Sequence, residues 1–410
     1  MRLTPKQNEY IRNANRRWNI KVGAVRSGKS YVDIAYSIPQ RIRERKGKAG
    51  LTFILGVSQA TIERNVLQPM REIYTDRLVG NIRGNNTARI FGEDVYCLGA
   101  EKVSQVGKIQ GASIKYCYGD EIARWNADVF GFIPSRLDKA YSCFEGACNP
   151  EYPSHWLKQF LDRDDIDSYI QHYTIFDNPY LPADVVQSMC HEYEGTVFYD
   201  RLILGEWVRA EGLVYPMYNN TVPTVERRYM RYVVSMDYGT LNPTAMILWG
   251  LGRDGVWYAM REYYYSGRET NQTLTDEQYY SALEALADGI PFNGLEKPTL
   301  IVDPSAASFI ATVYKHKRWK VRKAENAVID GIRRTAGVLA DKKIMFNDCC
   351  KRTIREFGEY SWDDSAVEDA VIKANDHAMD AVRYFVMTER IYRNREYLDY
   401  GNISRITGGY

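Results

Sequence analysis

One eight-residue stretch constrains this chain more than any other. Residues 23–30 read Gly-Ala-Val-Arg-Ser-Gly-Lys-Ser and match the phosphate-loop pattern G-x-x-x-x-G-K-[ST] at every position. The residues before the loop (19–22) predict a strand, and those after it (31–36) predict a helix. The glycines let backbone N–H groups surround phosphates, and the helix N-terminus adds its positive dipole end. The chain is therefore predicted to fold around a nucleotide-phosphate site.

Individual roles follow from the chemistry of such loops. Lys29 is expected to reach the β- and γ-phosphates of ATP, and Ser30 to hold Mg²⁺. Gly23, Ser27 and Gly28 are expected to complete the nucleotide-binding loop. The competing interpretation is a glycine turn that matches by chance, and the flanking strand and helix argue against it.

Size and composition narrow the class of protein. With 410 residues the chain is long enough for two domains. A net charge of +2 does not by itself indicate nucleic-acid binding, so any DNA contact must come from local patches. No apolar run is long enough for a membrane span, and no signal-peptide core precedes the loop. Seven cysteines without CxxC spacing argue against a disulfide framework and a zinc site.

Two further strand ends carry polar residues. The run 114–119 predicts a strand that ends at Asp120 and Glu121, where Asp120 would bind Mg²⁺ and Glu121 would polarise the attacking water. Lys115 interrupts that run and is expected to face an edge. The run 141–148 predicts a strand that ends at Asn149, which is placed to sense the γ-phosphate or, alternatively, forms a turn with Pro150. Strands alternate with helices here, which predicts a parallel sheet covered by helices.

The second half of the chain has a different pattern. Strands are expected over 232–237, 244–251, 256–264 and 300–303, with a helix over 276–287. Closely spaced antiparallel strands after a first strand that ends in Asp237 are typical of the beginning of an RNase H-like sheet. A second strand ends at Asp303, and a predicted helix over 374–385 carries Asp376 and Asp380 on one face, with His377 nearby.

These acids predict a metal site. Asp237, Asp303 and Asp380 supply hard oxygen ligands that suit Mg²⁺ or Mn²⁺ better than zinc. Two such ions would serve phosphodiester hydrolysis. Each Asp alone has an ordinary alternative as a turn residue or helix cap, and His377 could simply face solvent. The combination, in this order and on these elements, favours a catalytic cluster with His377 as an auxiliary ligand.

Basic residues cluster near the end of the chain. The clusters are expected to hold DNA phosphates, or else to form an ordinary charged surface; they comprise Lys315, Lys317, Arg318, Lys320, Arg322, Lys323, Arg333, Arg334, Lys342 and Lys343. The tail over 390–410 is expected to be exposed and basic.

Together these motifs resemble the large terminase subunit of tailed bacteriophages, and most nearly the PBSX-like prophage group. The resemblance includes Leu3-Thr4-Pro5-Lys6-Gln7, the phosphate loop, Tyr-Gly-Asp-Glu at 118–121, and the strand that ends at Asn149-Pro150. It continues through Gly-Glu-Trp at 205–207 and Gly-Leu-Val-Tyr-Pro at 212–216. The resemblance implies that Gln7 reads adenine, that Arg26 acts in the loop, and that Asn149 belongs to the coupling motif.

The resemblance also implies a fold and a function. The fold is α/β, with a P-loop (RecA/ASCE-like) ATPase domain over 1–208, a linker over 209–228 and an RNase H-like nuclease domain over 229–410. The function is an ATP-driven motor that packages double-stranded DNA into a procapsid and cuts concatemers with Mg²⁺ or Mn²⁺. Implied partners are the small terminase subunit and the portal protein, on which the C-terminal tail would dock. The protein would be a monomer in isolation and a ring when assembled, in the host cytoplasm, with Arg64 as a candidate for the arginine that one subunit supplies to its neighbour.

Two other functions remain open at this point. The chain could be a P-loop DNA translocase or helicase whose second domain only binds DNA, although no second motor core follows residue 210. A P-loop kinase is disfavoured by the acids of the second half. Plasmid nicking in Mn²⁺ would distinguish a nuclease from a binding module.

Overall fold

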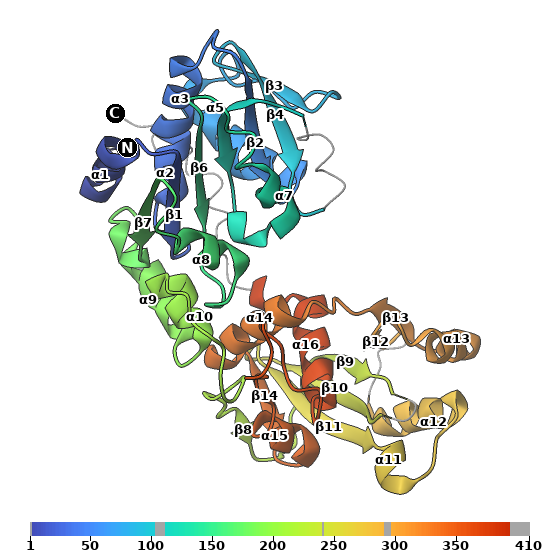
Figure 1. Ribbon diagram of the computed structural model, residues 1–410. Coiled ribbons are helices and arrows are strands. Elements are labelled where there is room, and N and C mark those ends of the chain that lie inside the picture. The colour runs from blue at the N-terminus through green and yellow to red at the C-terminus, as the bar shows by residue number, and fades with distance from the viewer. Residues whose placement is uncertain (1, 103–110, 240–241, 291–296, 394–410) are drawn as a thin grey trace, which may run out of the picture. The chain divides into compact units, whose positions relative to one another are not determined.

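A computed structural model of the chain describes residues 2–102, 111–239, 242–290 and 297–393. The tail at 394–410, whose docking role the resemblance implies, lies outside the described residues. Contacts group the chain into two compact units (Figure 1). Among the described residues, the first comprises those up to 187 together with 199–209, and the second comprises 188–198 and those from 210 to 393.

The first unit contains a seven-stranded sheet in the order β3-β4-β2-β5-β6-β1-β7. All neighbouring strands are parallel except the β3–β4 hairpin. The strands are β1 (Trp18–Gly23), β2 (Leu51–Gly56), β3 (Thr87–Ile90), β4 (Glu93–Gly99), β5 (Ile114–Gly119), β6 (Cys143–Cys148) and β7 (Ser168–Tyr173). The expected parallel sheet is present.

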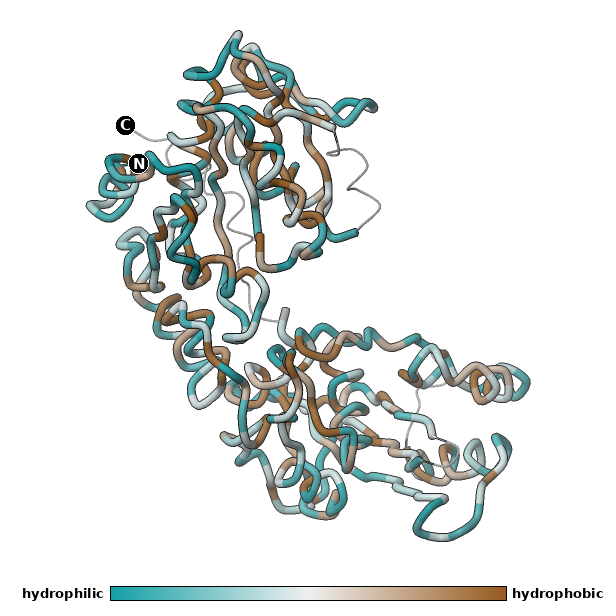
Figure 2. The backbone as a smooth tube through the Cα atoms, viewed as in Figure 1, coloured by the Kyte–Doolittle hydropathy of each residue, from teal (hydrophilic) through white to brown (hydrophobic). Residues whose placement is uncertain are grey.

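Helices cover this sheet on both faces. They are α1 (Pro5–Asn13), α2 (Lys29–Val32), η1 (Asp33–Ser37), α3 (Ile38–Glu44), α4 (Gln59–Ile62), η2 (Glu63–Leu67), α5 (Gln68–Tyr74), η4 (Ile122–Arg124), α7 (Ala127–Phe132), α8 (Trp156–Leu161), η5 (Ile175–Asp177) and η6 (Asp200–Leu204). Side chains that alternate along a strand enter different cores: Cys117 packs in one, and Tyr116 and Tyr118 in the other. The apolar segments accordingly run through the interior, and the outer loops are mostly hydrophilic (Figure 2).

Two helices of this unit contain a π-helical turn just before a proline. Pro39 has no N–H, so the carbonyl of Ala35 cannot receive its usual helical bond and instead accepts one from the Tyr74 hydroxyl at 2.6 Å. Pro69 follows η2 in the same way. The expected helix over 60–73 is therefore present as α4, η2 and α5, with its π-helical turn close to the nucleotide site.

The second unit contains a mixed seven-stranded sheet in the order β13-β12-β9-β10-β11-β14-β8. Strands β9, β10 and β11 form an antiparallel meander, and the remaining neighbours are parallel. The strands are β8 (Thr221–Val222), β9 (Tyr229–Asp237), β10 (Thr244–Gly252), β11 (Trp257–Tyr265), β12 (Thr299–Val302), β13 (Lys320–Lys323) and β14 (Ile344–Asn347). This is the expected RNase H-like arrangement.

The helices of the second unit are α11 (Gly267–Thr270), α12 (Asp276–Leu286), α13 (Ala307–His316), α14 (Val328–Ala340), α15 (Lys351–Phe357), α16 (His377–Glu389) and η7 (Ile391–Arg393). Two elements, α9 (Ala183–Tyr193) and α10 (Val197–Tyr199), extend across the division between the units. Helix α16 packs on β9, β10 and β12. No helix in the described part of the chain has the length and apolar character that a membrane crossing requires.

Three details differ from the sequence-based expectations. The contacts place 188–198 in the second unit, and the expected linker contributes the strand β8, which pairs with β14. Lys115 does not face an edge: β5 is an inner strand, and the buried ammonium group pairs with Glu93 at 2.9 Å. Helix α16 begins at His377 because Asn375 takes a positive φ of 54°, so Asp376 is the residue just before the helix, and its carbonyl accepts a bond from the Asp380 N–H at 2.8 Å.

Candidate nucleotide and metal sites

The phosphate loop leaves the end of β1 and enters α2 through a tightly fixed backbone. A Cβ on Gly23 would lie 2.0 Å from the carbonyl oxygen of Tyr173 on the neighbouring β7, so only glycine fits. Arg26 and Gly28 have positive φ values of 56° and 84°. The Asn178 side chain donates to the carbonyl of Arg26 at 2.7 Å. The loop is therefore held in its curved form by the unit itself.

Gln7 connects helix α1 to this loop. Thr4 caps α1, with its hydroxyl accepting from the Gln7 N–H, and Pro5 begins the helix. The Gln7 side chain is buried, accepts from the Thr4 N–H at 2.8 Å and donates to the carbonyl of Gly28 at 2.9 Å. Both ends of the amide already have partners, so in this state Gln7 braces the phosphate loop.

Lys29 is buried and points toward the sequence-predicted coupling residue. Its Nζ donates to the carbonyl of Ala24 at 2.8 Å and to Oδ1 of Asn149, just after β6, at 2.5 Å. Burial lowers the pKa of Lys29 to about 8, and the nearby acids Asp120 and Glu121 oppose that shift. The structure thus brings Lys29, Asn149 and the acid pair together. Ser27 Oγ is also buried here, with no hydrogen-bond partner among the described residues.

The acid pair follows β5 at the same edge of the sheet. Asp120 accepts a bond from the Asn65 side chain at 3.0 Å, and burial raises its pKa to about 6. Glu121 has a positive φ of 51°, which lets the chain turn sharply into η4. Arg64 is exposed on η2, and its charge acts on Asp120 of the same chain. Arg64 and Asn65 therefore both lie near Asp120. Sequence reasoning did not identify Asn65.

A buried ion pair lies close to the phosphate loop, with one partner on the strand before the loop and the other on the helix after it. Lys21 of β1 and Asp33 of η1 are both fully buried, with 2.6 Å between Nζ and Oδ1. Asp33 also accepts from the Tyr118 hydroxyl at 3.2 Å, and the Lys21 ammonium lies 3.6 Å from the centre of the Tyr10 ring. The sequence signal for this pair is a lysine inside the apolar run of β1, and sequence reasoning did not identify it.

The orphaned Ser27 hydroxyl, the fixed loop and the buried lysine fit the triphosphate of a nucleotide. Mg²⁺ fits the same place because Ser30 and Asp120 supply oxygen ligands. These contacts are all within the first unit.

The second unit brings the other three acids to one edge of its sheet. Strands β9 and β12 are parallel neighbours with Met236 opposite Val302, so the next residues along each strand are Asp237 and Asp303. Asp380 lies in the first turn of α16, which packs on both strands. The buried Tyr384 is affected by all three: burial raises its pKa most, and the charges of Asp237, Asp380 and Asp303 raise it further.

Each acid already has a partner. Asp237 Oδ2 lies 2.8 Å from Nδ1 of His377. Burial raises the pKa of Asp237, and the charge of Asp380 adds to that rise. Burial alone would lower the pKa of His377, but the hydrogen bond and charge of Asp237 outweigh it, and the pKa is raised above 6.5. Asp380 accepts from Arg383 at 2.7 Å.

Glu356 holds the helix that carries Asp380. Its buried carboxylate accepts from the N–H groups of Ala378 and Met379 at 2.7 and 3.3 Å. It thereby replaces the capping bond that Asp376 does not make. Sequence reasoning did not identify this residue.

The donor set suits a hard divalent cation, because carboxylate oxygens are what Mg²⁺ and Mn²⁺ prefer. Within the described residues, no three acidic, histidine or cysteine side chains already converge on one ion. The residue types of the cluster therefore fit such a metal. The geometry of the metal site depends on the residues that hold the three acids in place. None of the seven cysteines, all of which lie in the described residues, is part of a disulfide.

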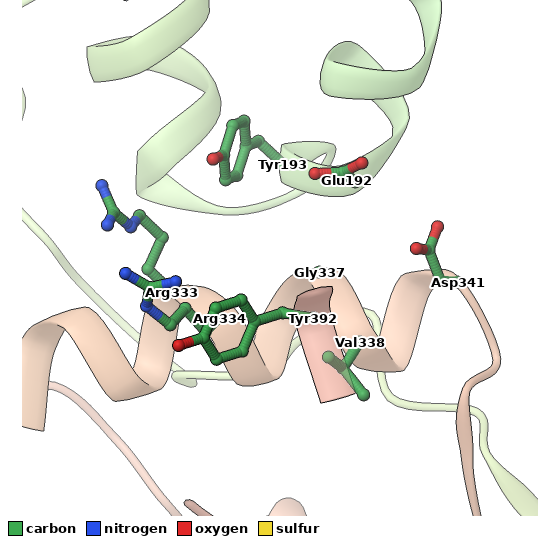
Figure 3. A pocket seen from close by; sticks show the side chains of 8 residues that line it. All are labelled: Glu192, Tyr193, Arg333, Arg334, Gly337, Val338, Asp341 and Tyr392. Carbon is green, nitrogen blue, oxygen red and sulfur yellow. The ribbon is translucent and has the colours of Figure 1, made fainter. Parts of the chain in front are cut away.

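A separate pocket in the second unit has a volume of about 210 Å³ (Figure 3). Arg333 and Arg334 of α14 face it, and both bind Asp330. The Arg334 guanidinium also lies 4.1 Å from the centre of the Tyr392 ring. Glu192 and Asp341 bring negative charge to the same lining. Because both acidic and basic side chains line the pocket, it does not favour binding of an anion. These two arginines are therefore poor candidates for contacts with DNA phosphates.

Fold and sites together define a class of protein: a P-loop ATPase domain followed by an RNase H-like nuclease domain on one chain. Comparison with solved structures narrows it. The large terminase of a thermophilic bacteriophage is 36% identical, with a TM-score of 0.83, covering 95% of this chain and 99% of that one. Structures of the same terminase with ADP and with ATP-γ-S are each 35% identical, with TM-scores of 0.80 and coverage of 94% and 98%. No protein-family profile matches the chain, and no curated protein matches it.

At this identity and coverage, the chain belongs to the family of bacteriophage large terminases.

Proposed function

We propose that this chain is the motor of phage DNA packaging, hydrolysing ATP to move double-stranded DNA into a procapsid. The observation that carries the proposal is full-length similarity to a terminase solved with ADP and with ATP-γ-S, combined with the cluster of the buried Lys29 and Asp120 and the half-buried Asn149. Gly23, Arg26, Ser27, Gly28, Lys29 and Ser30 would bind the triphosphate, with Gln7 bracing the loop.

The chain's own residues divide the ATPase work. Ser30 and Asp120 would hold Mg²⁺, which neutralises charge on the phosphates. Glu121 would orient a water for in-line attack on the γ-phosphorus and take its proton as ADP leaves. When a phosphate binds, Lys29 would give up its hydrogen bond to Asn149 and donate to the phosphate instead. Arg64 lies near Asp120 of its own chain, so we assign it to the same subunit's site rather than to a neighbour's.

We further propose that the second domain is an endonuclease that cuts concatemeric DNA. Asp237, Asp303 and Asp380 would hold Mg²⁺ or Mn²⁺, with His377 as an auxiliary residue, and the metal would activate water and stabilise the leaving 3′-oxygen. Asp237 orients His377, which would transfer a proton between the attacking water and bulk solvent. Exposed lysines of α13, its C-cap and β13 would bind phosphates, because β13 is the strand beside β12; they are Lys315, Lys317, Lys320 and Lys323.

The proposed partners are the small terminase subunit and the portal protein, in the host cytoplasm, with a monomer in isolation that assembles into a ring. Membership of the PBSX-like prophage group is part of the same proposal. The alternative is a translocase whose second domain only binds DNA, and it predicts DNA binding without cleavage.

A pair of variants tests both activities on the full chain. Glu121→Gln should lose DNA-stimulated ATP hydrolysis and keep plasmid nicking in Mn²⁺. Asp237→Ala should lose nicking and keep ATP hydrolysis. If the parent binds plasmid in Mn²⁺ but leaves it supercoiled, the nuclease proposal fails and the binding-only alternative is correct. If the parent hydrolyses no ATP with or without DNA, the motor proposal fails.

A further inference from the structure

The loop between β13 and α14 binds Asp303 directly and is linked to Asp380 through Arg383. The Asn326 side chain donates to Oδ2 of Asp303 at 3.2 Å. The backbone carbonyl of the same Asn326 accepts from Nη1 of Arg383 at 2.7 Å, and the carbonyl of Ala327 accepts from it at 3.1 Å. The other end of that guanidinium, Nη2, donates to Oδ1 of Asp380 at 2.7 Å. A continuous chain of contacts therefore links Asp303, on the sheet, to Asp380, on α16.

Arg383 is fixed in this position by burial as well as by bonds. It is only 2% exposed, and Asp380 is 9% exposed. A buried guanidinium is costly unless its charge and its donors are matched. Here a carboxylate and two carbonyls satisfy Nη1 and Nη2, whereas Nε has no hydrogen-bond partner among the described residues. The planar fork lets one side chain bind the loop and the acid in fixed directions, which a lysine ammonium cannot do.

Gly331 provides the space that this arrangement needs. A Cβ built on Gly331 would lie 2.6 Å from Cγ and 2.7 Å from Cδ of Arg383. Its φ is not in the left-handed region, so the backbone alone would accept any residue. A glycine inside a helix costs about 1 kcal/mol relative to alanine. The close approach of Arg383 is the structural reason why a glycine stands at this position despite that cost.

We propose that Arg383 is a positioning residue, braced by Asn326 and by the space at Gly331, that sets Asp380 relative to Asp303 for divalent-metal binding. The inference rests on the proposed nuclease function. It explains how an acid on a sheet edge and an acid on a helix keep fixed relative positions. Among the described residues, no three ligands yet converge on one point, so the metal itself would draw the acids together. A purely structural role, in which Arg383 only stabilises α16 and the loop, predicts lower stability with unchanged metal affinity.

The test measures Mn²⁺ binding to the full-length protein by calorimetry, without DNA or nucleotide. Gly331→Ala displaces Arg383 without removing it, Arg383→Lys keeps the charge but loses the fork, and Asn326→Ala removes the bond to Asp303 from an exposed loop. Gly337→Ala is the matched control on the same helix, because its Cβ would meet only Glu192 at 3.9 Å. Retained ATP hydrolysis and an unchanged far-ultraviolet circular dichroism spectrum report folding.

We expect Gly331→Ala and Arg383→Lys to weaken Mn²⁺ binding about tenfold or more, and Asn326→Ala to weaken it less. The Mn²⁺ concentration for half-maximal nicking should rise by the same factor, with turnover at saturating Mn²⁺ restored to within about threefold of the parent. Gly337→Ala should match the parent. Parent-like Mn²⁺ affinity in all three folded variants would overturn the positioning role alone. If the parent and Asp237→Ala both bind no Mn²⁺, the nuclease proposal fails and this inference fails with it.

Discussion

Lys29 Nζ donates a 2.5 Å hydrogen bond to Oδ1 of Asn149, which joins the phosphate loop to the end of β6. Both side chains lie in the first unit, and Lys29 is buried. A γ-phosphate that enters the loop must compete with Asn149 for the same ammonium group. Under the proposed function, this bond would therefore differ between the nucleotide-free and nucleotide-bound states of the site.

Replacing Asn149 tests this competition. Asn149→Asp keeps an acceptor but adds a negative charge, which should hold Lys29 more firmly and repel phosphate. We expect ATP affinity to fall about tenfold, equivalent to about 1.4 kcal/mol. Asn149→Ala is the matched control, since it frees Lys29 without adding charge, and its ATP affinity should stay within about threefold of the parent. Titration with a fluorescent ATP analogue in Mg²⁺ measures both, and equal affinities for the two variants would contradict the competition.

Glu121→Gln should separate binding from hydrolysis. The amide keeps the size of the side chain but cannot take a proton, and general-base contributions are about 10²- to 10⁴-fold in rate. We expect the ATP turnover number to fall by that range while ATP affinity is retained. Asp128→Asn on α7 is a nearby exposed-acid control that should leave turnover unchanged. A variant that hydrolysed ATP at the parental rate would remove Glu121 from the mechanism.

Gly205→Ala should destabilise the first unit beside the phosphate loop. Gly205 ends η6 with a φ of 80°, and an added Cβ would lie 2.4 Å from the carbonyl oxygen of Tyr173 and 2.8 Å from Cα of Gly23. Left-handed strain and overpacking together should cost about 3 kcal/mol. Gly47→Ala is the control, because its φ of 73° is similar but the added Cβ meets nothing within 4 Å. Thermal unfolding should show a clear loss for Gly205→Ala and only the smaller strain cost for Gly47→Ala.

Much of the fold and part of each site could be predicted from sequence because the signals are local. The phosphate loop is one contiguous motif between a strand and a helix, and Asp120, Asp237 and Asp303 each follow an apolar run that became a strand. Parallel pairing then brings such strand ends together without further information, as with β9 and β12.

The supporting residues could not be predicted because their partners are distant in sequence. Asn65 binds Asp120, Asn326 binds Asp303, and Glu356 caps α16, each across a span that no periodicity reports. Lys115 was misplaced for the same reason, since its buried position depends on Glu93 of another strand. The start of α16 was missed because the left-handed turn at Asn375 overrides a run that otherwise favours helix.

The buried pair of Lys21 and Asp33 predicts how stability near the phosphate loop changes with pH. Burial raises the pKa of Asp33 to about 7, although the charge of Lys21 and the bonds from Lys21 and Tyr118 oppose the rise and Glu145 adds to it. In the unfolded chain an Asp has a pKa of about 3.9. The folded state therefore holds the proton more tightly, and this contribution to stability is fully present below about pH 4 and is lost as the pH rises through about 7. One pKa unit corresponds to about 1.4 kcal/mol, so the loss should be a few kcal/mol.

The double variant Lys21→Met with Asp33→Asn removes both charges and keeps an acceptor for the Tyr118 hydroxyl. Replacing a buried pair by neutral groups of similar size is often neutral or stabilising, whereas removing one partner costs about 3–5 kcal/mol, so the double variant is preferred to either single change. Hydrogen exchange of β1 and α2 peptides in the full-length protein, corrected for intrinsic rates, gives the opening free energy at pH 5, 6, 7 and 8. We expect that free energy to fall with rising pH in the parent and to change less in the double variant. Parallel pH dependence in the two proteins would mean that Asp33 is already ionised throughout this range, held so by Lys21.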